Sequence, residues 1–141
     1  MKWILALAVT ALFALESGLD AVKAESNLEK RSEKALEYAA DVLTLVRTDI
    51  ETKPWATVEA QIQEFRAAID LSYESLKSSG KQARRSPKYF KKADVALRTL
   101  GRRLRGIQEV TNLDDRPKLD EVIAHVDRLQ DELVAMTMGE K

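Results

Sequence analysis

The sequence contains no cysteine and only one histidine, His125. The absence of cysteine excludes a disulfide framework, a thiolate metal site, an iron–sulfur cluster, a cysteine nucleophile and haem attached through Cys-x-x-Cys-His. Haem held without a covalent bond would need a methionine facing His125, but Met136 and Met138 lie about three turns further along the same predicted helix. We therefore expect the protein to have no cofactor.

Groups suited to catalysis or to metal binding are also few. Glu121 and His125 are four residues apart and share one helix face, whereas di-iron bundles repeat Glu-x-x-His on two helices. A nucleophilic triad would have to use His125 as well, and the chain has no Gly-x-Ser-x-Gly elbow. We predict neither enzyme activity nor a metal site, and we interpret His125 as a structural residue at the edge of the core. A metal- or haem-binding periplasmic four-helix bundle is the alternative hypothesis.

Long hydrophobic runs are absent except at the beginning of the chain. An apolar run from Trp3 to Leu15 follows a single lysine, and Val22 and Ala24 place small residues where a signal peptidase reads them. The run is too short for a transmembrane helix, which needs about 20 apolar residues. We predict a cleaved signal peptide over residues 1–24. The mature chain, residues 25–141, is then an exported domain, periplasmic or secreted, with no transmembrane helix.

Proline and glycine are scarce, with three prolines and five glycines in the chain. Most of them stand between segments of periodic apolar residues, where helix ends are expected. They divide the domain into four predicted helices of similar length, near residues 27–51, 54–78, 87–111 and 117–139. Because the connections are short, successive helices should be antiparallel neighbours. The predicted fold is all-α, an antiparallel up-down-up-down four-helix bundle, with two stacked helical hairpins as the alternative.

Apolar residues recur at a spacing of three and four along each predicted helix, as on a face that packs against other helices. The predicted core residues are Leu36, Ala39, Leu43, Val46, Ile50, Val58, Ile62, Phe65, Ile69, Leu76, Phe90, Ala93, Leu97, Leu100, Leu104, Ile107, Leu119, Val122, Val126, Leu129, Leu133 and Met136. Ser72 occupies one further position of this kind. A single core is therefore expected.

Local patterns also predict where helices begin and end. Ser26 and Glu29 have the spacing of a capping box, in which each side chain binds the other residue's free amide. Gly80 is expected to end the second helix in the left-handed conformation. Ser86 is expected to cap a third helix that begins at Pro87.

Charge is balanced over the whole chain, with 23 basic and 23 acidic residues, but it is unevenly distributed. Between Lys77 and Arg105 there are eleven basic residues and one acid, Asp94, whereas the rest of the predicted domain is acidic. If Phe90 occupies a core position of a heptad, most of these basic residues fall at positions that point away from the bundle. Like charges three or four residues apart repel. This face is therefore interpreted as a surface for an anionic partner.

The candidate anion-binding residues belong to the third predicted helix and to the loop before it. They are Lys81, Arg84, Arg85, Lys88, Lys91, Lys92, Arg98, Arg102 and Arg105. The expected partner is an anionic component of the bacterial envelope or an acidic protein. Nucleic acid is not expected, because no stacking aromatic residues interleave the basic positions. Two alternatives stay open: the basic helix selects the topology by pairing with acidic neighbours, or the bundle has a structural, oligomerising role.

Overall fold

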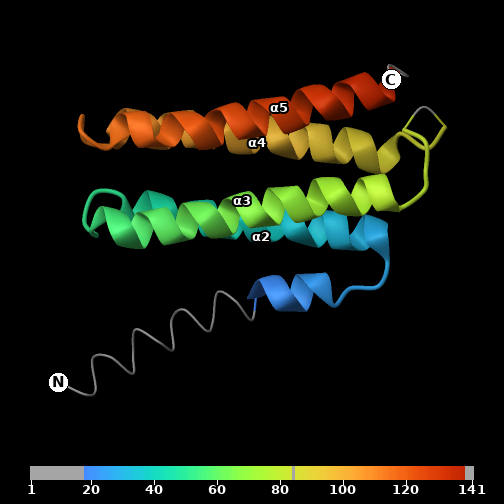
Figure 1. The fold of residues 1–141 in the computed structure, drawn as a ribbon, viewed down its shortest axis with the longest axis horizontal. Coiled ribbons are helices and arrows are strands. Elements are labelled where there is room, and N and C mark those ends of the chain that lie inside the picture. The colour runs from blue at the N-terminus through green and yellow to red at the C-terminus, as the bar shows by residue number, and fades with distance from the viewer. Residues whose placement is uncertain (1–17, 84, 139–141) are drawn as a thin grey trace.

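The structure, a computed structural model, describes residues 18–83 and 85–138. The predicted residues that lie outside these ranges are the apolar run, Arg84 and the last three residues of the chain. The long helices are α2 (Leu28–Asp49), α3 (Trp55–Ser78), α4 (Lys88–Val110) and α5 (Asp120–Thr137), and a 3-10 helix, η1 (Arg116–Leu119), leads into α5 (Figure 1). Residues 18–23 form a further short helical segment. The predicted all-α bundle is confirmed.

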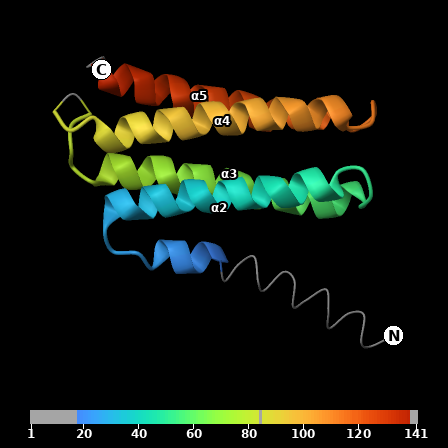
Figure 2. The same ribbon diagram turned by 180° about the vertical axis from the view of Figure 1, so that it is seen from behind.

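The four long helices form two antiparallel hairpins that stack on each other. Helix α2 pairs with α3 and helix α4 with α5, and the second hairpin lies over the first (Figure 1). Seen from behind, α2 and α4 lie side by side on the same face (Figure 2). These two helices run in the same direction, because Lys92, near the beginning of α4, reaches Glu33, near the beginning of α2.

The short connections predicted that successive helices are antiparallel neighbours. Helices α2 and α4 do not follow this pattern, because they are neighbours and run parallel to each other. Five residues (50–54) join α2 to α3, and five (111–115) join α4 to η1, so each hairpin is antiparallel as expected. The nine residues from 79 to 87 join α3 to α4. Fully extended, they span up to about 30 Å, which is several times the usual spacing of about 8–10 Å between packed helices. This connection is long enough to place α4 beside α2 instead of α3.

The helix ends agree with the predicted ones to within two residues, except that α5 begins at Asp120, three residues after the predicted position, because the 3-10 helix η1 precedes it. Asn27, and not Ser26, caps α2, because its side chain accepts a hydrogen bond from the backbone amide of Lys30 at 3.0 Å. Gly80 follows α3 with a φ of 72°, as predicted. Helix α4 begins at Lys88 and has no side-chain cap, so the predicted cap at Ser86 is wrong. The amide of Ser86 instead donates to the carbonyl of Gln82 at 2.9 Å.

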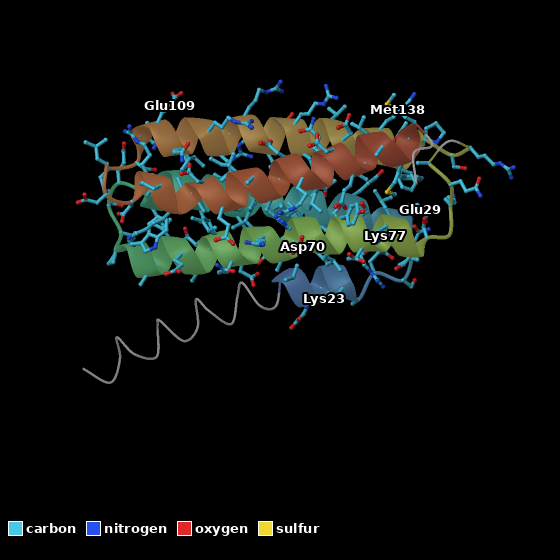
Figure 3. The ribbon with its side chains drawn as sticks, turned by 45° about the horizontal axis from the view of Figure 1, so that its top comes forward. Lys23, Glu29, Asp70, Lys77, Glu109 and Met138 are labelled. Atoms are coloured by element: carbon cyan, nitrogen blue, oxygen red, sulfur yellow. The ribbon has the colours of Figure 1, made fainter. Side chains whose placement is uncertain are left out.

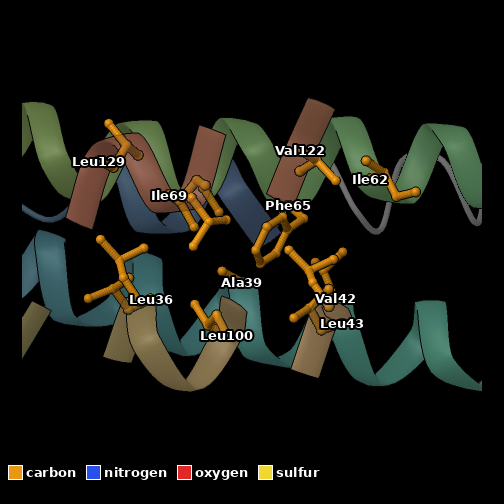
Figure 4. Packing of buried hydrophobic residues seen from close by; sticks show 14 of the residues in the cluster. Leu36, Ala39, Val42, Leu43, Ile62, Phe65, Ile69, Leu100, Val122 and Leu129 are labelled. Atoms are coloured by element: carbon orange, nitrogen blue, oxygen red, sulfur yellow. The ribbon is translucent and has the colours of Figure 1, made fainter. Parts of the chain in front are cut away.

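The core contains the residues that the apolar spacing predicted. All of the predicted positions are buried except Met136, which is half-buried near the end of α5. Figure 4 shows Phe65 of α3 among side chains from both hairpins. Because Phe65 and Ile69 are fully covered, both hairpins contribute to one apolar interior and stabilise each other by excluding water from it.

Helices α2 and α3 pack together more extensively than any other pair. Small buried residues allow this close approach, since the distance between helix axes depends on the side chains at the contact. These residues are Ser32, Ala35, Ala39, Ala68, Ser72 and Ser75. The hydroxyl oxygens of Ser32 and Ser72 lie 2.7 Å apart and satisfy each other in the interior.

Residues 18–24, the last part of the predicted signal peptide, pack against the outer side of the first hairpin (Figure 1). Leu19 and Val22 are buried there, and Gly18 lies beside the ring of Tyr38, so closely that a Cβ on Gly18 would approach that ring to 2.7 Å. Burial and a hydrogen bond to Glu64 raise the pKa of Tyr38. The segment and the second hairpin therefore pack against different sides of the first hairpin.

Candidate functional site

The basic side chains that were predicted to bind anions lie on α4 and on the loop before it. Buried residues of α4 face the bundle, so the opposite side of the helix is exposed along its whole length. Figure 3 shows side chains projecting outward from α4, between the end near Met138 and the end near Glu109. The structure separates the basic residues into those that bind a carboxylate or carbonyl of the bundle and those that do not.

Two candidate residues bridge α4 to neighbouring helices, contrary to the expectation that they point away from the bundle. The ammonium of Lys92 lies 3.2 Å from the carboxylate of Glu33 on α2. The guanidinium of Arg105 binds both carboxylate oxygens of Asp127 on α5, at 2.8 and 2.9 Å. Both basic residues stand at the edges of the exposed face, where a long side chain reaches the next helix. For these two, pairing with acidic neighbours explains their position.

Arg103 also points toward α2. Its guanidinium donates to the carbonyl of Ala40 at 3.3 Å and to the hydroxyl of Thr44 at 3.0 Å. Together with Lys92 it lines a shallow groove between α2 and α4, whose other wall carries Glu33 and Glu37. Because acids and bases face each other across this groove, its charge is compensated.

Lys81 connects the loop to the first hairpin. Its ammonium lies 3.0 Å from the carboxylate of Glu29, and this hydrogen bond lowers the pKa of Glu29. The ammonium groups of Lys81, Lys88 and Lys92 surround the ring of Tyr89 at 5.9, 5.4 and 5.8 Å from its centre. These cation–π contacts place three positive charges around one half-buried ring at the beginning of α4.

The remaining candidates on α4 form a straight line on its outer face. Residues 88, 91, 95, 98 and 102 follow one another at spacings of three and four, so they share one side of the helix. We call them the outer stripe: Lys88, Lys91, Val95, Arg98 and Arg102, all exposed. At 1.5 Å per residue the outer stripe is about 21 Å long.

Most of the charge on the outer stripe is uncompensated. Lys88, Lys91 and Arg102 form no ion pair with any residue in the described ranges; Arg102 donates to the hydroxyl of Thr99 at 3.4 Å. Arg98 binds Asp94 of the same helix at 3.3 Å. Arg85, in the preceding loop, is exposed and likewise lacks an ion pair within the described part of the chain. The outer stripe thus carries the excess positive charge that the other helices do not neutralise.

His125, the single histidine, takes part in a hydrogen-bond network between α3 and α5. Its Nε2 lies 2.5 Å from Asp70 and its Nδ1 3.1 Å from Arg128. Glu121 binds Arg66 instead, so Glu121 and His125 are engaged with separate partners. Within residues 18–83 and 85–138 no three carboxylate or imidazole groups are gathered as metal ligands would be.

A scan against protein-family models found no matching family, and searches of curated proteins and of solved structures found no similar protein. In the described part of the chain, no helix is both long enough and apolar enough to cross a bilayer.

Proposed function

We propose that the protein is an exported helical-bundle binding module whose outer stripe recognises an anionic surface or an acidic partner. The single observation that supports this most directly is the division of the basic residues. Lys81, Lys92 and Arg105 bind carboxylates of other helices, which is what a role in selecting the topology requires. Lys88 and Lys91 have no such partner among the described residues.

Local electrostatics support the same conclusion. Lys88, Lys91, Arg98 and Arg102 are neighbours at spacings of three, seven and four residues on one helix face, where like charges destabilise the helix by a few tenths of a kcal/mol per close pair. A solvated surface would be served equally well by mixed charges. An anionic partner would attract all four of these cations. The same attraction would increase the rate at which the partner associates with the protein.

The proposal is tested with a soluble polyanion, poly-glutamate, titrated into the protein at several salt concentrations. We expect binding that weakens steeply as salt increases, because exposed charges are screened. The variant Lys88→Glu/Lys91→Glu should bind roughly tenfold more weakly at low salt, since each exposed ion pair contributes up to about 1 kcal/mol.

The matched control is Lys30→Glu/Lys53→Glu. It changes the net charge by the same amount, but both residues are exposed on the first hairpin or its connection and bind no carboxylate in the described chain. If the two variants lose affinity equally, only the net charge matters and the outer stripe is not a binding surface. If neither variant changes the affinity, the proposed function is wrong.

A further inference from the structure

The middle of the outer stripe is apolar. Val95 stands between the four cations with 62% of its surface exposed, and Met138, just after α5, is 69% exposed. A shallow hollow between α4 and α5 is lined by both of these residues, together with Val134 and Thr137. Two large apolar side chains therefore share a solvent-exposed area with the unpaired cations.

The lysine stems extend this apolar area. A second hollow on α4 is lined by Lys88, Lys91 and Lys92 around Val95 and Ala96. The methylene groups of a lysine can cover apolar surface while its ammonium stays in a polar environment. The result is an apolar patch that is edged by positive charges. Among the described residues, Asp94, held by Arg98, is the single acid that lines it.

We propose that the partner of the outer stripe is the surface of an anionic lipid bilayer. Val95 and Met138 would enter the headgroup region, while Lys88, Lys91 and Arg102 contact lipid phosphates, as basic residues near anionic membranes do. This inference rests on the proposed function and names its partner. Binding of this kind is peripheral, because one valine and one methionine bury far less apolar surface than a transmembrane helix.

The composition of the patch favours a lipid surface over an acidic protein. Protein interfaces are enriched in aromatic residues at their centre and depleted in lysine. The outer stripe has no aromatic residue and has lysines directly beside its apolar centre. It also lies along the exposed side of α4, which is open to an extended surface such as a membrane.

The test measures binding of the full chain to two kinds of vesicle, pure phosphatidylcholine and phosphatidylcholine containing one third phosphatidylglycerol. The apolar run at the beginning of the chain would bind both kinds of vesicle. The quantity of interest is therefore the ratio of the affinity for the anionic vesicles to the affinity for the neutral ones. We expect Val95→Asn to reduce that ratio about tenfold, and Lys88→Glu/Lys91→Glu to reduce it about thirtyfold or more.

The control for Val95→Asn is Leu113→Asn. Leu113 is 76% exposed in the connection after α4, remote from the patch in sequence and at the other end of the second hairpin. Leu113→Asn should leave vesicle binding unchanged, and Val95→Asn should leave poly-glutamate binding unchanged, because a soluble polyanion has no apolar region for valine to enter. Folding of both variants is checked by circular dichroism, and exposed positions are expected to tolerate the change.

The outcomes separate the inference from the proposed function. If Val95→Asn binds anionic vesicles as tightly as the unmodified chain, or if anionic vesicles are bound no better than neutral ones while poly-glutamate is bound, the lipid inference is overturned and the proposed function stands. If Lys88→Glu/Lys91→Glu changes binding to neither ligand, the proposed function fails as well. Loss of vesicle binding in Val95→Asn but not in Leu113→Asn supports the lipid inference.

Discussion

The two hairpins of this protein pack their helices together with side chains of different size. In the α2/α3 hairpin, small side chains such as Ala39 and Ala68 bring the helices close together, and residues 18–24 and the second hairpin pack against different sides of it. In the α4/α5 hairpin, large aliphatic side chains such as Leu104 and Leu133 fill the interface, and α4 keeps one side exposed. The first hairpin is thus packed against other parts of the chain on two sides, while α4 of the second hairpin divides its surface between the core and a charged, exposed face.

A cavity should damage the second hairpin most. We predict that Leu104→Ala lowers the free energy of unfolding by about 2–5 kcal/mol, because Leu104 is fully buried and its loss leaves a cavity. Urea denaturation measures the change. Leu113→Ala, at an exposed position of the same hairpin region, should change the free energy little. Equal effects of the two substitutions would contradict the assignment of α4's inner face to the core.

Overpacking should damage the first hairpin most. Ala39→Leu adds methylene groups at a fully buried position between α2 and α3, and we expect it to cost about 1–3 kcal/mol. Ala60→Leu, on the exposed side of α3, is the control and should be nearly neutral. The same denaturation experiment decides between them. If Ala39→Leu is tolerated without loss, the small residues do not determine how closely the two helices approach.

Removing residues 18–24 would make the two hairpins more alike, because the part of the first hairpin that this segment covers would then be exposed. We predict that a chain beginning at Glu25 is less stable than one beginning at Gly18 by about 1–2 kcal/mol. Burial of Leu19 and Val22 contributes about 1.5–3 kcal/mol each, and the entropy cost of ordering the segment offsets much of this. Thermal unfolding compares the two chains. The longer chain carrying Leu19→Ser and Val22→Ser should lose stability as the shorter one does, whereas equal stability of all three would show that the segment does not hold to the bundle.

The smallest expected effect is a pH dependence at the beginning of the first hairpin. A hydrogen bond from Lys34 lowers the pKa of Glu25, and one from Lys81 lowers the pKa of Glu29, below their ordinary value of 4.5. A lowered pKa in the folded state means that the ionised carboxylate stabilises the fold above pH 4.5, and that this contribution is lost as pH falls further. The free energies of unfolding of the native chain and of the variant Glu25→Gln/Glu29→Gln should therefore differ at pH 7 and become equal in acid. Curves that stay parallel down to about pH 3 would exclude the two carboxylates as the cause.

Much of this fold could be predicted from the sequence, because periodic apolar residues and helix-ending residues act locally. The spacing of Leu97, Leu100 and Leu104 predicted the inner face of α4, and Gly80 predicted the end of α3. The neighbour relations of the hairpins could not be predicted in this way. They depend on the path of the connection from 79 to 87. Its length allows α4 to lie directly beside α3, and it equally allows α4 to lie across the bundle beside α2.

The candidate site was predictable in outline and not in detail. The density of basic residues near α4 is a local property of the sequence, whereas the partners of Lys92 and Arg105 lie on α2 and α5, far away in the chain. A heptad position gives only the direction in which a side chain leaves the helix. A long basic side chain at the edge of a helix face can still turn toward a neighbouring helix. Val95 was missed because a single exposed valine has no meaning until its neighbours in space are known.

The most direct test of the central claim, that the outer stripe binds anions, is an NMR titration of the labelled protein with poly-glutamate. We predict that the amide signals of residues 88, 91, 95, 98 and 102 shift progressively, that signals from α2 and α3 stay in place, and that the shifts diminish as salt is added. Shifts confined to the first hairpin, or spread evenly over the exposed basic residues of the whole chain, would contradict this claim.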